Sequence, residues 1–494
     1  MRSPSLSLAL GALALVAACT PPALPPAPPP PPRPAPAPTV TPDAPFRGQA
    51  PAPAPEPTFV PPVIAQAALS NGVPVLLVER HDMPVVEVRI VVRRGGEVGA
   101  PGVGAFVGAM LSQGTKHRSA LAISDAFETI GADWGTGASY DATLAHAQVV
   151  SSQLDPALDL LADCVRNSSF PRAEVERERA KRLSTLAQDR DRPATLLANM
   201  VGFTLYPDGH AYKLPLMGTD ASLRAVKPDT LSQFFHDHFT PDRATIVVAG
   251  DVTKDVLVAK LERAFGSWRG RAAKVDPPAA PPPPAAGEPR VVLVDRPGAT
   301  QTGVAVAQVG VARTTEDFYP LLVASTILGG QFTSRLNLNL REKHAFTYGA
   351  SASFEMRHGP GPFRAGGAIV REHTAEAVQE IFAEIERIAK EPVADDELAD
   401  AKSYLVRKLP AQFETVQETA SSVAQLAVYG LPLDDYATRA AKIAAVTAAE
   451  VQKAVAAHLS AEALRVVLVG DAAAIRGPLE ALGLGAPLEY PASK

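Results

Sequence analysis

Cysteine is nearly absent from this chain, which has 2 cysteines among 494 residues. Cys19 lies near the N-terminus, and Cys164 lies in the apolar stretch L-D-L-L-A-D-C-V. If Cys19 is modified, Cys164 has no partner for an intramolecular disulfide, so we expect hydrophobic cores rather than cross-links to hold the fold. Cys164 itself is expected to be a small core side chain.

Aromatic residues are scarce, and neither sign of charge predominates strongly. Trp, Phe and Tyr make up 6% of the chain, the net charge is -5, and Lys and Arg are dispersed rather than gathered in a basic stripe. Glycine patterns that cradle phosphates do not occur in a convincing strand-to-helix context. The pairs Gly95-Gly96 and Gly329-Gly330 predict turns instead. Nothing in the composition indicates nucleic-acid binding.

A short apolar run lies close to the N-terminus. It extends from Leu6 to Ala18 behind Arg2 and is too short to cross a bilayer as a stable helix. Its end, V-A-A-C at Cys19 followed by Thr20, is similar to a bacterial lipoprotein signal. An ordinary signal peptide with an incidental cysteine is the alternative. We therefore expect a signal peptide at 1–18, acylation of Cys19 and a lipid anchor in the bacterial envelope, on the periplasmic face of the outer membrane.

Proline is plentiful, with 48 residues, and concentrates in two stretches. Residues 19–65 are mostly Pro and Ala and predict a disordered spacer, up to ~100 Å long at about 3 Å per residue. Residues 276–289 form a second Pro-rich stretch and predict a linker. The folded region is thereby divided into two halves, 66–275 and 290–490.

The two halves carry similar patterns. The sequence A-T-I-V-V-A-G-D at 244–251 has a counterpart, L-R-V-V-L-V-G-D, at 464–471. Strands are predicted at 75–79, 88–95, 143–150, 303–310, 348–354 and 363–370, and helices at 121–130, 156–167, 173–189, 375–390 and 395–408. Strands and helices interleave without a strict βαβ period, which favours an α+β fold of two homologous, layered α/β halves.

The most informative segment is 102–115, which reads G-V-G-A-F-V-G-A-M-L-S-Q-G-T. Gly102, Phe106, Met110, Gly114 and Thr115 resemble the frame G-x-x-H-F-x-E-H-M-x-x-x-G-T of the M16 (pitrilysin/insulinase, mitochondrial-processing-peptidase-like) zinc peptidases. In that family the frame carries the H-x-x-E-H motif, with two zinc ligands and a general base on one helix.

The zinc-binding residues of the frame are replaced here. Ala105, Gly108 and Ala109 stand where the family has His, Glu and His. By the family's spacing the third ligand, a Glu on a charged helix, falls on Thr185, while Glu178 matches a supporting acid of that helix. Alanine and glycine have no lone pair for a metal, and no carboxylate remains to take a proton from bound water. The resemblance thus implies neither a metal site nor a catalytic residue in the first half.

The second half retains a different element of the family. Residues 328–336 read L-G-G-Q-F-T-S-R-L, and Arg341 and Tyr348 follow seven positions apart. This resembles the family's L-G-x-x-x-S-R-L…L-R-E…Y element, which supplies an Arg and a Tyr to a catalytic site built by the other half. A cation and a phenol donor suit a substrate carbonyl and the oxyanion formed from it. The alternatives are a surface ion pair for Arg341 and a core strand position for Tyr348.

The resemblance covers roughly residues 66 to 475, and it implies a role. In some branches of the family two chains pair, one with H-x-x-E-H and one with the Arg/Tyr element. This chain resembles the second kind: a non-catalytic subunit that binds no cofactor, pairs with a zinc-bearing subunit and contributes Arg341, Tyr348 and half of a peptide chamber. A homodimer, a stand-alone peptide-binding or envelope scaffold pseudopeptidase, and a metalloendopeptidase with non-standard ligands remain alternatives.

Overall fold

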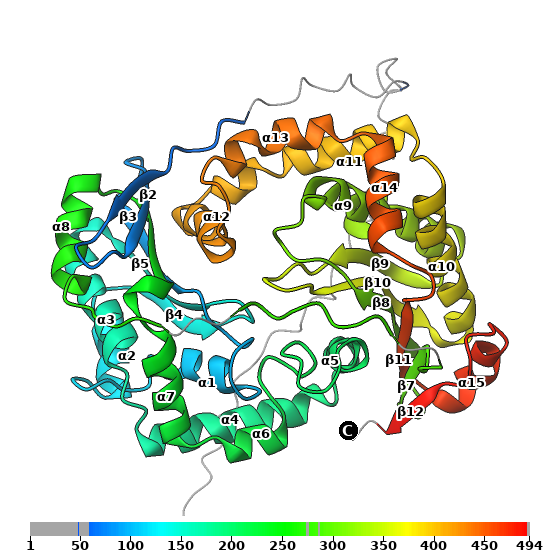
Figure 1. The fold of residues 1–494 in the computed structure, drawn as a ribbon, viewed down its shortest axis with the longest axis horizontal. Helices are drawn as coiled ribbons and strands as arrows, with labels where there is room; N and C mark the ends of the chain where they lie inside the picture. The colour runs from blue at the N-terminus through cyan, green and yellow to red at the C-terminus, as the bar shows by residue number, and fades with distance from the viewer. Residues whose placement is uncertain (1–47, 49–58, 273–275, 285–286, 492–494) are drawn as a thin grey trace, which may run out of the picture. The chain divides into compact units, whose positions relative to one another are not determined.

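Two sheets with matching strand orders organise the computed structural model, which describes Gly48 and residues 59–272, 276–284 and 287–491 (Figure 1). Within these residues the first sheet has the order β1-β2-β6-β3-β5-β4 and the second β12-β7-β11-β8-β10-β9. The first sheet comprises β1 (Ala65–Ala68), β2 (Pro74–Glu79), β3 (Val85–Val92), β4 (Asp133–Ala138), β5 (Thr143–Val150) and β6 (Ala244–Gly250). The second comprises β7 (Val291–Asp295), β8 (Gln301–Val309), β9 (Thr347–Phe354), β10 (Pro362–Val370), β11 (Arg465–Gly470) and β12 (Leu488–Pro491). The predicted signal peptide, Cys19 and most of the predicted spacer lie outside the described residues.

Strand pairing is the same in the two sheets. Strands β2 and β6 are parallel, as are their counterparts β7 and β11. The next three pairs of each sheet are antiparallel and end at an edge strand, β4 in the first sheet and β9 in the second. Only the outermost strands differ, because β1 is antiparallel to its neighbour and β12 is parallel. The two homologous α/β halves are therefore confirmed.

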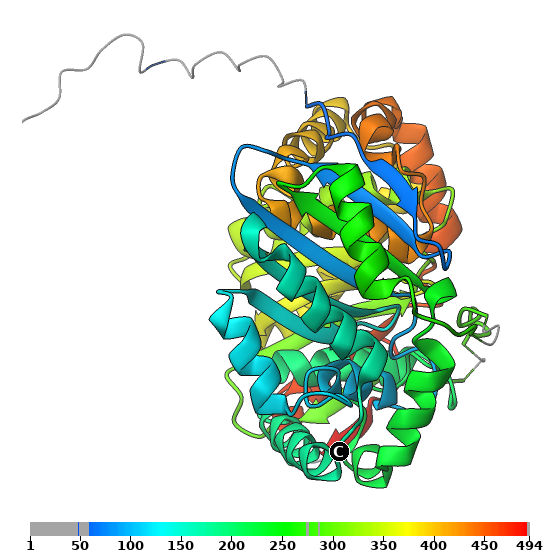
Figure 2. The same ribbon diagram turned by 90° about the vertical axis from the view of Figure 1, so that its left-hand side faces the viewer.

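One face of each sheet is covered by helices that belong to the same half as the sheet (Figures 1 and 2). The first half contains α1 (Val103–Met110), α2 (Ala120–Thr129), α3 (Leu154–Asn167), α4 (Arg172–Asp189), α5 (Pro193–Leu205), α6 (Asp220–Ala225), α7 (Pro228–His238) and α8 (Lys254–Phe265). The second contains α9 (Phe318–Ser325), α10 (Thr374–Lys390), α11 (Asp395–Arg407), α12 (Val416–Tyr429), α13 (Asp435–Ala445), α14 (Ala448–His458) and α15 (Ala472–Glu480). Capping boxes at Thr219, Thr415 and Thr447 start α6, α12 and α14, where each hydroxyl accepts a backbone N–H that the helix leaves unpaired.

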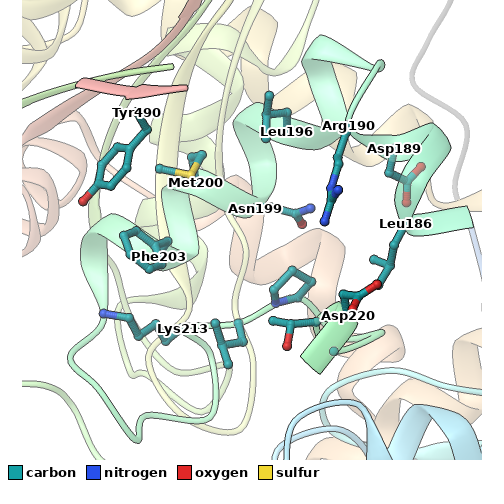
Figure 3. Close-up of a pocket in the computed structure, with 14 residues that line it drawn as sticks. Leu186, Asp189, Arg190, Leu196, Asn199, Met200, Phe203, Lys213, Asp220 and Tyr490 are labelled. Carbon is teal, nitrogen blue, oxygen red and sulfur yellow. The ribbon is translucent and has the colours of Figure 1, made fainter. Parts of the chain in front are cut away.

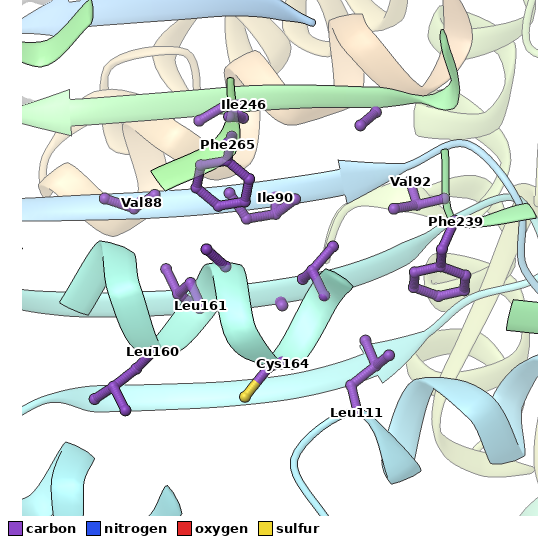
Figure 4. Close-up of a cluster of buried hydrophobic side chains, with 14 of the residues drawn as sticks. Val88, Ile90, Val92, Leu111, Leu160, Leu161, Cys164, Phe239, Ile246 and Phe265 are labelled. Atoms are coloured by element: carbon purple, nitrogen blue, oxygen red, sulfur yellow. The ribbon is translucent and has the colours of Figure 1, made fainter. Parts of the chain in front are cut away.

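Amphipathic helix α3 shows how the first core is built (Figure 4). Leu158, Leu161 and Val165 recur at helical spacing and are buried against the sheet residues Val88 and Ile90. Cys164, on the same helix, is buried in this core as predicted, and burial raises the pKa of its thiol to about 12. A thiol that stays protonated behaves as an apolar side chain.

The opposite face of each sheet is covered by a helix from the other half. Helix α12 packs its Ala420 and Val423 on Val91 and Val247 of the first sheet. Helix α5 packs its Leu196 and Met200 on the second sheet, in a cluster with the strand residues Val292, Val294, Ala305, Ala307, Val467 and Val469. The two halves thus complete each other's cores.

A buried carboxylate joins the halves near α12. Asp141, in the turn between β4 and β5, accepts hydrogen bonds from the hydroxyls of Tyr212 (3.3 Å) and Tyr429 (3.0 Å) and from the backbone N–H of His358 (3.1 Å). Tyr429 and His358 belong to the second half. Three donors on one carboxylate replace the water lost on burial.

Two expectations are corrected by the structure. Strand β3 begins at Val85 and ends at Val92, three residues earlier than the predicted 88–95. Gly329 and Gly330 do not form a turn: they end the π-helical segment η4 (Thr326–Gly330), which packs against β9. Of the helices in the described ranges, none is both long enough and apolar enough to cross a membrane.

Candidate functional site

Helix α1 carries the altered frame and is fixed on two sides. It begins after Gly102, whose φ of 86° lies in the left-handed region that glycine adopts without strain. A Cβ on Gly104 would lie 2.1 Å from the carbonyl oxygen of Gly95, so the helix touches the turn that follows β3. Gly102 and Gly104 therefore both allow close backbone packing at the start of α1, a role that needs no metal.

Gly108, at the position of the family's general base, faces the edge strand β4. A Cβ added there would lie 2.9 Å from the carbonyl carbon of Gly137 and 3.0 Å from both the backbone N and the Cβ of Ala138. These neighbours are strand atoms that cannot swing away as a flexible side chain can. Position 108 therefore has no room for a glutamate in this backbone arrangement.

Arg182 of α4 occupies the neighbourhood of Ala105. Its Nη2 donates to the carbonyl oxygen of Ala105 at 2.9 Å, its Nε lies 2.8 Å from Oε1 of Glu178, and its guanidinium lies 4.9 Å from the ring centre of Phe106. Burial lowers the pKa of Arg182, while Glu178 opposes that shift. A fixed cation thus stands beside α1, where the family has a metal ligand.

The remaining two substituted ligand positions, Ala109 and Thr185, are half-buried and together cannot supply the ligands of a metal ion. Ala109 ends in a methyl group, and the Thr185 hydroxyl donates to the carbonyl oxygen of Lys181 at 3.1 Å. In the described part of the chain, no group of three or more His, Cys, Asp or Glu side chains is arranged to hold a metal ion. The residues around α1 do not fit zinc, because they offer no set of lone pairs and place a guanidinium alongside.

Glu97, just before α1, is a buried acid with a shifted titration. Burial raises its pKa to about 7, and hydrogen bonds, including one from the N–H of Gly95 at 2.8 Å, oppose the rise. Its carboxylate lies 3.7 Å from Nη1 of Arg94. Sequence reasoning did not single out Glu97, since only the fold reveals its burial.

Arg341 lies on the π-helical segment η5 (Asn337–Lys343), with about a third of its side chain exposed. Its guanidinium lies 4.4 Å from the ring centre of Phe332, while its Nε is 3.4 Å from Oε1 of Glu342. Phe332 is itself 62% exposed. The surface ion pair considered for Arg341 is thus present, and an exposed aromatic face accompanies it.

Tyr348 lies at the start of β9, the edge strand of the second sheet, and is 90% exposed. The core position considered for it is therefore wrong. Between Arg341 and Tyr348 the backbone passes through Ala345 at a φ of 56°, an uncommon conformation for a residue with a Cβ. Such strain persists only where the surrounding structure holds it in place.

The side chains around α1 and those of residues 332–348 make no contact that the described part of the chain records. Arg341, Tyr348, Phe332 and half-exposed Leu338 come from one stretch, residues 332–348, which we call the Arg341 surface. Among described residues, no hydrogen bond, ion pair or ring contact joins Arg341 or Tyr348 to α1 or α4. The sequence analysis did not identify Phe332 and Leu338 as members of this surface. Their apolar side chains in a polar stretch that follows Gly329 and Gly330 were an available signal.

Comparison with known proteins covers both halves. The family model described as "Insulinase (Peptidase family M16)" matches residues 75–220, and that described as "Peptidase M16 inactive domain" matches residues 225–405. The "Uncharacterized zinc protease YmxG" of Bacillus subtilis is 26% identical over 368 residues, covering 73% of this chain and 87% of the relative. An "Uncharacterized zinc protease" of Mycobacterium bovis is 30% identical over 304 residues, covering 62% of this chain and 69% of the relative.

Solved structures show the same architecture. The crystal structure of a peptidase M16 inactive domain from Pseudomonas fluorescens superimposes with a TM-score of 0.76 at 25% identity, covering 83% of this chain and 98% of the other. A protease from Helicobacter pylori has the same fold, with a TM-score of 0.73 at 20% identity, covering 83% of this chain and 99% of the other. With both family models and these relatives in agreement, the chain belongs to the M16 (insulinase) peptidase family.

Proposed function

We propose that this chain is a non-catalytic M16 subunit that pairs with a zinc-bearing H-x-x-E-H subunit. Zinc and the general base come from the partner, while this chain contributes Arg341, Tyr348 and part of the enclosure around a peptide. The observation that carries the proposal is the contact at Gly108, where a single added carbon would lie 2.9 Å from the backbone of β4. A base cannot occupy that position without moving the strand.

The exposure of Tyr348 supports the second part of the proposal. The exposed phenol of Tyr348 and the guanidinium of Arg341 lie on one stretch with the exposed ring of Phe332, so the surface offers two donors beside an apolar face. A tyrosine O–H and an arginine can donate hydrogen bonds to a peptide carbonyl, and more strongly to the oxyanion formed when water attacks it. Among the described residues the Tyr348 hydroxyl makes no hydrogen bond, and the Arg341 guanidinium contacts only Glu342 and Phe332.

We also propose that a lipid on Cys19 anchors the chain to the periplasmic face of the outer membrane. The support is the sequence V-A-A-C with polar Thr20 behind it. Several acyl chains hold a protein on a membrane because each buried methylene contributes ~0.8 kcal/mol. Cys19→Ala is expected to move the protein from the membrane fraction to the soluble periplasmic fraction, measured by fractionation and immunoblotting.

The pairing is tested by co-expressing the chain with an H-x-x-E-H homologue from the same genome. We expect a complex that cleaves unfolded peptides, whereas this chain alone does not. Arg341→Ala and Tyr348→Phe should lower kcat by at least about tenfold, as expected when a transition-state donor is lost. The amount of complex should stay unchanged.

Matched controls distinguish substrate holding from general damage. Arg476→Ala removes a half-exposed arginine on α15 that pairs with Glu489, and Tyr404→Phe removes a hydroxyl on α11. Both should leave kcat unchanged. Activity of the purified chain alone that chelators abolish would contradict the proposal, as would a complex indifferent to Arg341→Ala and Tyr348→Phe. Stoichiometric peptide binding without any partner would favour the stand-alone scaffold instead.

A further inference from the structure

A cavity of about 360 Å³ lies beside α5 (Figure 3). Its lining includes no residue of α1 and none of the Arg341 surface. Its walls are mainly apolar and come from the end of α4, from α5, from residues 213–220 and from β12: Leu186, Leu196, Met200, Phe203, Leu214 and Tyr490. Phe203 and Tyr490 meet edge to face, with ring centres 5.8 Å apart. The volume falls within the ~300–1,000 Å³ of typical small-molecule sites.

Two hydrogen-bond donors line this cavity and have no protein partner in the described residues: exposed Arg190 and half-buried Asn199. Figure 3 shows the ends of the Arg190 and Asn199 side chains near one another among the residues that line the cavity. Within the described ranges, neither the Arg190 guanidinium nor the Asn199 amide makes a side-chain hydrogen bond, and Arg190 has no ion pair. Donors that converge beside apolar walls fix the orientation of a ligand that brings an acceptor.

The nearby acids are already paired with other arginines. Asp220 binds Arg224 at 2.6 Å, and Arg224 is the main cause of the lowered pKa of Asp220. Asp189 lies 3.7 Å from Arg192. Arg190 adds only a weaker, longer-range attraction to Asp220. The charge left over at the cavity is therefore positive and complementary to a single anion.

We propose that this cavity binds a small amphiphile with an apolar chain and one carboxylate, such as a medium-chain fatty acid. The chain lies against Met200 and Phe203, and the carboxylate accepts from Arg190 and Asn199. Tyr490 belongs to the second half and the other named residues to the first, so the ligand bridges the halves where α5 meets the second sheet. Binding should then stabilise that junction.

Titration calorimetry on the purified full chain tests the assignment, with decanoate as the probe. Decanol and decyltrimethylammonium have the same tail with a neutral or a cationic head, and butyrate has the same head with a short tail. Decanoate should bind at least about tenfold more tightly than each of them, as expected for a charge-assisted hydrogen bond and a buried tail. It should also raise Tm.

Variants separate head from tail. Arg190→Gln should bring the affinity for decanoate down to that for decanol, and Leu214→Trp, which fills the half-exposed wall, should abolish binding of all the probes. Arg263→Gln on α8 is the matched control, since it removes an exposed arginine elsewhere, and should bind as the parent does.

Three results would overturn the proposal. The first is that the parent chain binds decanoate and decanol equally, and the second is that Arg190→Gln binds decanoate as the parent does. The third is that an acetylated peptide ending in a free leucine carboxylate binds the parent more tightly than decanoate does. The last would assign the cavity to peptide C-termini. Arg190→Gln keeps the test valid even if Leu214→Trp does not fold. None of these results depends on the proposed pairing with a peptidase.

Discussion

The missing side chain at Gly108 and the close approach of β4 are two aspects of one packing arrangement. Glycine is a poor helix former, about 1 kcal/mol worse than alanine, and would not be expected in the middle of a buried helix without a reason. The reason is the Gly137–Ala138 backbone, which lies within about 3 Å of the missing Cβ. The sequence shows only that position 108 lacks the family's glutamate. The structure adds the reason why glycine suits this position.

Gly108→Ala should therefore destabilise the protein. Overpacking against strand backbone costs about 1–3 kcal/mol and the gain in helix propensity offsets ~1 kcal/mol of it, so the expected net loss is up to about 2 kcal/mol. Gly137→Ala, on the facing strand, is the matched control, because a Cβ there meets nothing within 4 Å. Denaturant unfolding should show a lower free energy for Gly108→Ala alone, and equal stability of the two variants would refute the packing argument.

Restoring the family's residues should not restore metal binding. The fourfold variant Ala105→His, Gly108→Glu, Ala109→His and Thr185→Glu supplies the ligands, yet the β4 backbone and the guanidinium of Arg182 remain in place. We expect metal analysis after dialysis to find well below one zinc per chain. A stoichiometric, chelator-sensitive zinc ion in this variant would contradict the geometry.

Glu97 should make stability depend on pH. Its folded-state pKa of about 7 lies above the ordinary 4.5, so between these values the folded protein holds more protons than the unfolded chain. Its stabilising effect is therefore complete below about pH 4.5 and is lost as the pH rises through 7. Glu97→Gln should gain up to about 3 kcal/mol relative to the parent between pH 5 and pH 8, measured by urea unfolding. A constant difference would show that Glu97 titrates normally.

At the scale of helices and strands, the elements predicted correctly are those whose residue pattern repeats with the period of a strand or a helix. Strand β5 and helix α4 were located to within one residue, because β5 alternates every second residue and α4 is a long run of good helix formers rich in Glu, Arg and Lys. Helices α5 and α12 were missed. Helix α5 is apolar on most sides because it lies between the two halves, and such a helix lacks the one-sided pattern that reveals an amphipathic helix. The capping box of α12, Thr415 with Glu418, was an available signal.

The contacts that hold α12 in place include the Asp141 carboxylate. Asp141→Ala leaves two tyrosine hydroxyls and one backbone N–H without their acceptor, and each buried unpaired donor costs about 1–3 kcal/mol. We expect a loss of about 3 kcal/mol in unfolding free energy and faster amide exchange at His358. Asp133→Ala, an exposed acid on the adjoining strand β4, should change stability by no more than about 0.5 kcal/mol.

At the scale of the whole chain, the two-half architecture could be inferred from repeated patterns, but the interlocking of the halves could not. Repeats reveal similar units, whereas the contacts between units depend on which apolar faces remain uncovered after each unit folds. Arg341 and Tyr348 were singled out by their spacing in the sequence, and the structure shows that both side chains reach the surface; their role in holding substrate stays a prediction. Arg182, which lies beside α1, carries no such signature.

Separately expressed halves should not be stable. Residues 59–272 alone would leave Val91 and Val247 exposed, and residues 287–491 alone would leave Val292 and Val467 exposed. We expect each fragment to aggregate, and the two co-expressed fragments to co-purify in equal amounts. The measurement is size-exclusion chromatography with light scattering; a monomeric, cooperatively folding single half would contradict this.

The reciprocal placement of α5 and α12 has an evolutionary consequence. Two identical copies of an ancestral half, each donating one helix across a two-fold axis, would form the same object without any covalent connection. Gene fusion would then add only a tether, and the fused copies would be free to diverge. The residues of α1 and those of the Arg341 surface could then change independently of each other, since neither set lies on the exchanged helices α5 and α12.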